Sequence, residues 1–495
     1  MCTFAVFYCL EKAVLYMIKN ITPQNFIKTN GGVFEGFGTS LCWWAHRVGY
    51  SEKLCKKAGK LFFSEEGLNL NIMRYNIGGG DDPSHNHIER TDSAVPGYLE
   101  YDKNSGKAIW NFEADKNQLA VLKSAYENAG EDSYVEVFSN SPPYFMTNSG
   151  CSSGSANAVD NNLRDDCIEA FAKYLADVSS YIEKELHIKI KSVSPMNEPD
   201  TDYWKMFSPK QEGCHTDPGE KQSELLCATR KAFDEAGLSH VILAASDETS
   251  TERQINSYKM YSDEAKKAVG RISTHSYITD KIEELGALRE KEGFNLWMSE
   301  VDGAGTEGES AGEMSAALWL SKKIISDINV LGPSAWVLWL VMDYHKSKDG
   351  YNGKTDNWNY DKEKGFWGLG HCDHDEEEYV LTQKYYAFGQ FTRYIRPGMT
   401  LIRVDENTLG AYDKNTGRLS VVYVNCKNEN ENITFDLAAF SKVGESCETV
   451  VTSGSVENGK HWYNENGILC VNDKKINAFA EPNSVTTFIL DGVEL

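Results

Sequence analysis

Apolar residues in most of this chain form short continuous runs that alternate with segments of helical period. The eight runs cover residues 34–41, 70–77, 135–139, 190–195, 241–246, 272–277, 296–300 and 335–342. The helical segments between them include 51–63, 116–129, 165–186, 222–236, 252–269, 282–291 and 313–330. Strands that alternate with helices pair in parallel through right-handed crossovers, and eight such units favour a closed (β/α)₈ barrel over residues 34–396.

The pattern changes after Arg396-Pro397-Gly398, where short β-type runs are separated by turn residues. These runs predict a β-sandwich domain over residues 397–495. Residues 25–33 are β-like but too short to stand alone, so we expect them to add a strand to that sandwich. The overall prediction is an α/β protein with a barrel and a smaller β-sandwich.

The first residues do not fit a standard targeting signal. The apolar run 2–10 has no Lys or Arg before it, Glu11-Lys12 interrupts it, and it is too short to span a membrane. We interpret residues 1–24 as a leader outside the folded unit, with Met17 as a possible true start. A cytoplasmic protein without a membrane partner is expected, and secretion is the alternative.

Composition narrows the class of ligand. A formal net charge of −23, without clustered Lys and Arg, argues against nucleic acid as a partner. Eleven Trp and twenty-five Tyr are consistent with sugar binding, since flat rings pack on the apolar faces of sugars. The twelve cysteines are scattered, and several lie in apolar runs (Cys42, Cys167, Cys227, Cys470), so we expect reduced, buried thiols. Composition does not indicate an oligomeric state.

Two of the apolar runs end on a glutamate, Glu198 after the fourth strand and Glu300 at the end of the seventh. A carboxyl group closes an apolar strand where the chain turns from core to cleft, although each glutamate alone could cap a helix or pair with an Arg. In a barrel the carboxyl ends of the strands form one face, where active sites lie. The sequence therefore predicts one site with two carboxylates.

Paired carboxylates are the machinery of glycoside hydrolysis, in which one acid protonates the leaving oxygen and a second group meets the anomeric carbon. We assign Glu198 as acid/base and Glu300 as nucleophile, and expect Glu198 to lie in the drier environment with a raised pKa. Asn197 is placed to contact the sugar 2-hydroxyl. Arg74 and Tyr277 are expected to hold Glu300 ionised and oriented.

Other polar and aromatic residues follow the predicted strands and are candidates for substrate binding. Trp339 is expected to form the floor of the sugar site, and the remaining candidates are Asp81, Tyr144, His275, Trp43 and Trp44. For the aromatic residues, ordinary core packing is the alternative.

Several motifs resemble glycoside hydrolase family 30. Asn197-Glu198-Pro199 and Glu300 match the wider superfamily of retaining (β/α)₈ glycosidases, and the narrower likeness rests on residues 36–40 (GFGTS), 74–79 (RYNIGG), 274–277 (THSY) and 481–488 (EPNSVTTF). The likeness implies a side β-sandwich built from both termini and no cofactor. Residues 40–45 (SLCWWA) are similar to the endo-β-1,6-galactanase-like branch, which implies β-1,6-linked galactan side chains as substrate.

Three other hypotheses remain open. His85 and His87, or the run 371–374 (HCDH), offer metal-ligand types, but a short gap on a polar loop seldom supplies three converging ligands, so we expect no metal. A non-catalytic carbohydrate-binding protein would be expected to lack one of the two glutamates. An exo-acting β-glycosidase on glucosides, fucosides or xylosides differs in the loops around the site, such as 81–97 and 346–370.

Overall fold

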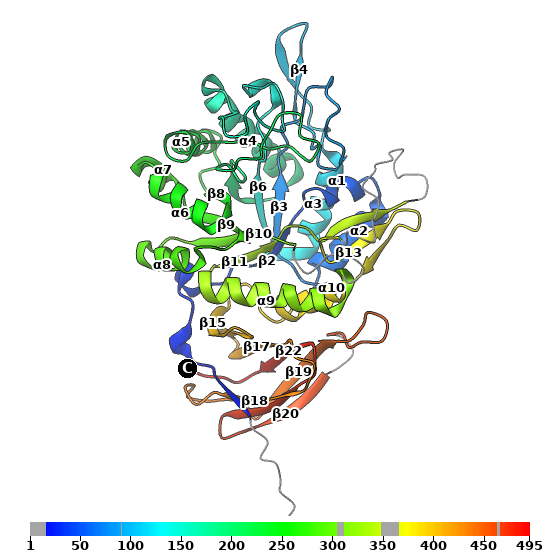
Figure 1. The fold of residues 1–495 in the computed structure, drawn as a ribbon, viewed down its shortest axis with the longest axis vertical. Coiled ribbons are helices and arrows are strands. Elements are labelled where there is room, and N and C mark those ends of the chain that lie inside the picture. The colour runs from blue at the N-terminus through cyan, green and yellow to red at the C-terminus, as the bar shows by residue number, and fades with distance from the viewer. Residues whose placement is uncertain (1–15, 91, 304–310, 348–365, 463–465) are drawn as a thin grey trace, which may run out of the picture.

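Eight parallel strands close into a barrel in the computed structural model of the protein, which describes residues 16–90, 92–303, 311–347, 366–462 and 466–495 (Figure 1). Neighbours along the chain pair side by side, and the last strand pairs with the first. The strands are β2 (Gly36–Ser40), β3 (Ile72–Asn76), β6 (Tyr134–Phe138), β7 (Ile190–Ser194), β8 (Ile242–Ser250), β9 (Arg271–Ile278), β10 (Leu296–Val301) and β11 (Ala335–Leu338). Each overlaps one predicted run, and the predicted fold class is confirmed.

The helices around the barrel follow from their apolar periodicity. In α4 (Ile168–Leu186) the side chains of Phe171, Leu175, Val178 and Ile182 lie on one buried face, and the helix ends where His187 takes a left-handed backbone with φ of 55°. The others are α1 (Trp44–Val48), α2 (Glu52–Ala58), α3 (Lys116–Ala129), α5 (Glu220–Glu235), α6 (Thr251–Met260), α7 (Asp263–Ala268), α8 (Ile282–Glu292), α9 (Met314–Leu331) and α10 (Gln383–Thr392). The sequence analysis did not predict α10.

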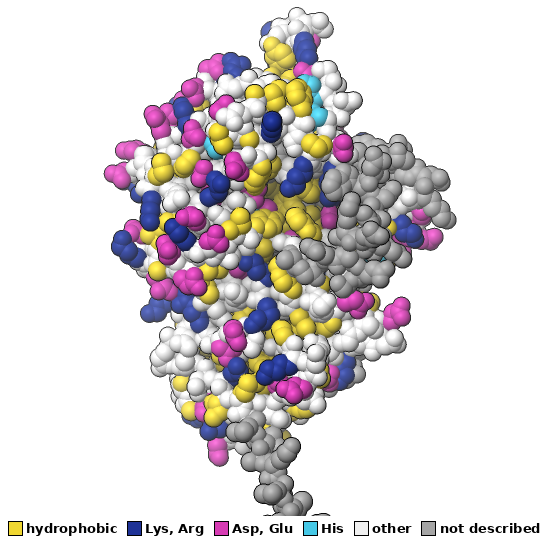
Figure 2. All heavy atoms as spheres, viewed as in Figure 1, with side chains coloured by type: hydrophobic (Ala, Val, Ile, Leu, Met, Phe, Trp, Pro, Cys, Tyr) yellow, Lys and Arg dark blue, Asp and Glu magenta, His cyan; other side chains and the backbone are white. Residues whose placement is uncertain are grey.

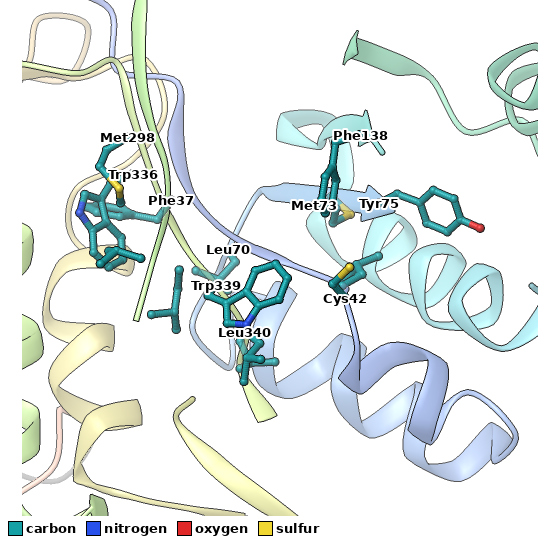
Figure 3. Packing of buried hydrophobic residues seen from close by; sticks show 14 of the residues in the cluster. Phe37, Cys42, Leu70, Met73, Tyr75, Phe138, Met298, Trp336, Trp339 and Leu340 are labelled. Atoms are coloured by element: carbon teal, nitrogen blue, oxygen red, sulfur yellow. The ribbon is translucent and has the colours of Figure 1, made fainter. Parts of the chain in front are cut away.

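The main apolar core lies between the barrel strands and the helices around them. Figure 3 shows side chains of several strands in it, among them Phe37 of β2, Met73 of β3 and Met298 of β10. All three are at most 2% exposed. Parallel strands covered on both faces need apolar residues at successive positions, which explains why the runs in the sequence are continuous rather than alternating.

The smaller domain is a nine-stranded sheet whose two halves enclose a second core. Its order is β1-β18-β21-β20-β19-β22-β17-β16-β15. Ile433 and Phe435 of one half share this core with Val421 and Phe488 of the other, as expected for a sandwich. Helices α9 and α10 lie between this sheet and the barrel (Figure 1). The strands are β15 (Thr400–Asp405), β16 (Thr408–Asp413), β17 (Arg418–Asn425), β18 (Glu431–Asp436), β19 (Ser446–Ser453), β20 (Asn466–Asn472), β21 (Lys475–Ala480) and β22 (Ser484–Leu490).

The N-terminal strand of this sheet is not where the sequence analysis placed it. Strand β1 (Met17–Asn20) pairs in parallel with β18, Met17 opposite Ile433. Residues 25–33 instead contain the end of one short 3₁₀ helix and the whole of another, with a single bridge between Phe26 and Ile402. The prediction of a strand at 25–33 was therefore wrong, and so was the placement of 17–24 in a leader outside the fold. Residues 1–15 lie outside the described part.

Two additions border the carboxyl end of the barrel. A hairpin of β4 (Leu99–Asp102) and β5 (Lys107–Trp110) projects from the top in Figure 1. A small sheet follows β11, made of β12 (Met342–Lys346), β13 (Gly370–Asp373) and β14 (Glu378–Leu381). Of the loop 346–370, which the sequence analysis connected with endo or exo action, residues 348–365 lie outside the described part.

Acidic and basic side chains are interspersed on the face shown in Figure 2. Every described cysteine is a free thiol, but the expectation of burial holds only in part: Cys42 is buried, Cys167 and Cys227 are half-buried, and Cys470 on strand β20 is exposed. Cys470 was predicted to be buried because the residues next to it in the sequence are apolar, but this segment of the sheet has only one covered face. No described helix combines the length and apolarity needed to cross a bilayer.

Candidate active site

Glu198 lies just beyond the end of β7, in a strained but well-supported turn. Its backbone has φ of 48°, an uncommon conformation for a residue other than glycine. Its N–H donates to the carbonyl of Asp247 at 2.8 Å, and its own carbonyl accepts from Nε1 of Trp204 at 2.9 Å. These contacts hold the turn, so that the carboxyl group is directed to the mouth of the barrel.

Glu300 reaches the same mouth from β10 at an irregularity in the strand. The register of β10 shifts after Met298 relative to both neighbours, β9 and β11. An extra residue in a strand redirects the side chains that follow it. Oε2 of Glu300 accepts from Nη1 of Arg74 at 2.9 Å, and Oε1 accepts from the hydroxyl of Tyr277 at 3.0 Å. Both contacts are those that the sequence analysis predicted.

The two carboxyl groups face each other with His275 between them. One oxygen of Glu198, one oxygen of Glu300 and a ring nitrogen of His275 all lie within 4.8 Å of one another. Nδ1 of His275 is 3.1 Å from Oε1 of Glu198 and 3.6 Å from Oε1 of Glu300. A carboxyl separation of about 5 Å is the one associated with retaining glycosidases, because a wider gap is needed to admit water in one step.

Glu300 belongs to a buried network of charged side chains centred on Arg74. The guanidinium of Arg74 is fully buried and donates to three carboxylates, those of Glu300, Glu136 at 3.0 Å and Asp247 at 3.2 Å. It also lies 4.2 Å from the ring centre of Phe138. Burial lowers the pKa of Arg74, but the three carboxylates raise it more, so the guanidinium stays charged.

The pKa values of the pair do not follow the predicted order. Burial is the largest influence and raises both, but at Glu198 the hydrogen bond and charge of His275, together with hydrogen bonds from Tyr203 and Thr249, outweigh it and lower the pKa. At Glu300 the charges of His275 and Arg74 lower the pKa, while burial and Glu198 keep it raised. Glu198 is 9% exposed and Glu300 4%, so the expectation that Glu198 lies in the drier environment was wrong for the free site.

The aromatic candidates divide into two groups. Trp43 and Trp339 meet edge to face at 5.1 Å and are slightly exposed. Trp44 is fully buried instead, since it begins α1 and packs against Phe62. The prediction that Trp44 lines the sugar site was therefore wrong.

The remaining predicted residues lie in different parts of the mouth. Asn197 is 4% exposed, and its side-chain oxygen has no hydrogen-bond partner among the described residues. Tyr144 and Asp81 lie away from the glutamate pair and line a neighbouring cavity of about 450 Å³ together with Glu212. The structure thus joins Arg74, His275 and Tyr277 to the two glutamates, and it places Asp81 and Tyr144 at a second position along the mouth.

Four residues of the site were given no role by the sequence analysis: Tyr203, Glu136, Asp247 and Glu212. The hydroxyl of Tyr203 donates to Oε2 of Glu198, and Glu136 and Asp247 are the further partners of Arg74. A charged residue inside an apolar strand, such as Glu136 in YVEVF, was an available signal. Tyr203 had none, because its position depends on how the loop after Glu198 folds.

Burial of Glu212 predicts an unusual dependence of stability on pH. Burial raises its pKa to about 8, although Asn76 and the N–H of Gly79 donate hydrogen bonds to it. A raised carboxyl pKa gives stability that is complete below the unfolded value, about 4.3, and is lost as the pH rises through the folded value. We expect Glu212→Gln to weaken the fall in Tm between pH 5 and pH 8, measured by scanning calorimetry. The exposed Glu66→Gln is the control, and equal slopes in both variants would contradict this assignment.

Comparison with known proteins agrees with this geometry. The model of O-Glycosyl hydrolase family 30 matches residues 27–352. An endo-β-1,6-galactanase of Hypocrea rufa is 28% identical over 490 residues, which cover 94% of this chain and 94% of that protein. An exo-β-1,6-galactobiohydrolase of Bifidobacterium longum is 24% identical, but the match covers 86% of this chain and 35% of that longer protein.

Solved structures give the same fold. The catalytic domain of a GH30 xylanase C from Talaromyces cellulolyticus superposes with a TM-score of 0.69 at 18% identity, covering 96% of this chain and 99% of that one. At this level of identity the likeness supports the barrel with its side sheet and not a substrate.

Proposed function

From the premise that this chain belongs to O-Glycosyl hydrolase family 30 and is a glycoside hydrolase, we propose that it is a retaining endo-β-1,6-galactanase. The observation that carries the proposal is the match to a curated endo-β-1,6-galactanase along 94% of both chains. The pair of carboxyl groups within 4.8 Å supports the retaining chemistry. The substrate would be the β-1,6-linked galactose side chains of a larger glycan.

In this proposal the reaction proceeds by two displacements at the anomeric carbon. Glu300 attacks that carbon while Glu198 gives its proton to the departing glycosidic oxygen, and a glycosyl ester forms on Glu300. A water molecule then gives a proton to Glu198 and attacks the same carbon, which releases the sugar with its original configuration. Arg74 and Tyr277 would stabilise the carboxylate of Glu300 whenever it is free.

Protonation of Glu198 is the part of this mechanism that depends most on bound substrate. In the free site His275 lowers the pKa of Glu198 after burial has raised it. A glycosidic oxygen can only accept a hydrogen bond, and therefore favours the protonated form of a carboxyl group beside it. A bound glycan also removes water from Glu198, which raises its pKa further.

A panel of substrates tests this proposal. The purified protein is incubated with β-1,6-galactan, β-1,6-glucan, xylan and aryl β-glycosides, and the products are separated by chain length. We expect β-1,6-galactan to be cleaved, with oligosaccharides of mixed length early in the reaction, and NMR to show the β-anomer first. Galactobiose or galactose as the sole early product would indicate exo action, and cleavage of glucan or xylan without galactan would contradict the substrate.

A further inference from the structure

A second cluster of polar side chains lies on the catalytic face, apart from the glutamate pair. Asp81, His85 and His87 belong to the loop after β3, and Cys151 belongs to the loop after β6. One donor atom from each of the four residues lies within 4.8 Å of all the others. Cys151 is fully buried, and the side chain of His87 is 11% exposed.

The distances in this cluster are those of ligands around a small ion. Nδ1 of His85 is 3.2 Å and Nδ1 of His87 3.5 Å from Oδ2 of Asp81. The other ring nitrogen of His87, Nε2, lies 3.6 Å from Sγ of Cys151, and only one nitrogen of this ring can bind a given ion. Around a tetrahedral Zn²⁺ with bonds of about 2.0 Å to N and O, such donors lie about 3.3 Å apart. The nitrogen–oxygen distances agree with this spacing, and Cys151 offers its sulfur within 4.8 Å of one donor atom from each of the other three residues.

A second observation also points to a ligand. Nδ1 of His87 is buried, and its contact with Asp81 lacks the geometry of a hydrogen bond, so among the described residues it has no hydrogen-bond partner. Such a nitrogen is costly unless something outside the chain satisfies it. The other oxygen of Asp81, Oδ1, accepts from the N–H of Ser152 at 3.0 Å, which orients the carboxylate.

We propose that Asp81, His85, His87 and Cys151 bind one zinc ion. Thiolate and imidazole donors select zinc over Mg²⁺ or Ca²⁺, which prefer oxygen ligands. Four protein ligands leave no open position, so the site is structural and not catalytic. The sequence analysis expected no metal because a short gap on a polar loop seldom supplies three converging ligands, and Cys151 joins the two histidines only in the folded chain.

Another buried group of similar composition does not carry the same inference. His345, Cys372 and His374 also lie within 4.8 Å of one another. However, Nδ1 of His374 is 3.0 Å from the hydroxyl of Tyr50, and its Nε2 is 2.8 Å from Nδ1 of His345. Because this second group offers three donor residues rather than four and its two histidines contact each other directly, we do not extend the inference to it.

The zinc ion would join two loops that border the cavity beside the active site. Asp81 and Ser152 line that cavity, and the ring of Phe207, from the loop after Glu198, packs on His85 at 5.1 Å and on His87 at 5.5 Å. Loss of the ion is expected to loosen the wall of the cavity. We expect KM for long glycans to rise severalfold, with a smaller change for an aryl glycoside that occupies only the position next to the glutamates.

The metal content of the full-length protein tests the proposal. The protein is purified without added metal and analysed by mass spectrometry of the elements, and we expect about one zinc per chain. A chelator should remove it and lower Tm by several degrees, and Zn²⁺ but not Mg²⁺ should restore Tm. Cys151→Ser and His87→Ala should lose the ion, whereas Cys167→Ser, a half-buried thiol elsewhere, should keep it.

A measurement on the unaltered protein covers the case in which the variants fail to fold. Replacement of zinc by Co²⁺ should give the near-ultraviolet absorption of a thiolate bound to cobalt. Protein that holds no zinc and shows no change of Tm on its addition, or a cobalt form without the thiolate band, would overturn the site. Because the readouts are metal content and stability, either result leaves the proposed hydrolase activity to its own test.

Discussion

Replacement of Glu300 by Gln is expected to abolish hydrolysis of every substrate, with a loss of roughly 10⁴-fold or more in kcat/KM. Gln has nearly the shape of Glu but cannot form the glycosyl ester that the proposed first displacement needs. The contacts with Arg74 and Tyr277 at 2.9 and 3.0 Å indicate that the side chain is already positioned for attack. Binding of the glycan, measured by calorimetry, should persist in this variant.

Glu198→Gln distinguishes the two roles, because an acid matters only when the leaving group needs a proton. On β-1,6-galactan we expect a loss on the order of 10²- to 10⁴-fold. On an aryl galactoside with an acidic phenol the first displacement should be nearly unchanged, and a burst of phenol should precede slow release of the sugar. The same pattern in Glu300→Gln, or unchanged turnover in either variant, would contradict the assignment.

The barrel could be predicted from the sequence because its strands are continuous apolar runs that can be recognised without knowledge of their neighbours. Strands β7 and β10 are buried on both faces, so IKSVS and LWMSEV read as strands whatever surrounds them. Helix α10 carries no such signal. Nearly all of its residues are buried between the barrel and the sheet, from Gln383 to Thr392, so it has no polar face and no helical period.

Strand β1 was missed for the opposite reason. Its four residues, MIKN, are mostly exposed at the edge of the sheet, and only the pairing with β18 makes them a strand. The sequence analysis predicted an N-terminal strand from the β-like residues 25–33, in agreement with the family resemblance, but placed it in the wrong segment.

The glutamate pair was predictable because each residue ends an apolar run, whereas its support was only partly so. Arg74 and Tyr277 stand out as polar groups within apolar strands. Asp247 is also a polar residue after an apolar run. Its side chain contacts Arg74 and its backbone carbonyl accepts from the N–H of Glu198, and neither contact can be predicted from the sequence. The predicted order of the pKa values of Glu198 and Glu300 was wrong because His275 contacts both carboxyl groups. Nothing in the sequence indicated that His275 lies between them.

Arg74→Met is expected to affect stability and the pH dependence of activity together. It removes the shared cation of three buried carboxylates, and loss of one partner from a buried ion pair costs about 3–5 kcal/mol. Tm should therefore fall markedly. Glu300 also loses a contact that lowers its pKa, so that pKa should rise.

The sign of the pH effect follows from the role proposed for Glu300. A nucleophile must be ionised, so kcat/KM falls as the pH drops below its pKa. A higher pKa in Arg74→Met therefore moves the acidic limb of the profile to higher pH. Arg271→Met is the matched control, since Arg271 is also fully buried, pairs with Glu136 and lies 3.6 Å from the ring centre of Trp297. It should destabilise the protein without moving the acidic limb, and coincident limbs in Arg74→Met and the unaltered protein would show that Arg74 does not set the ionisation of Glu300.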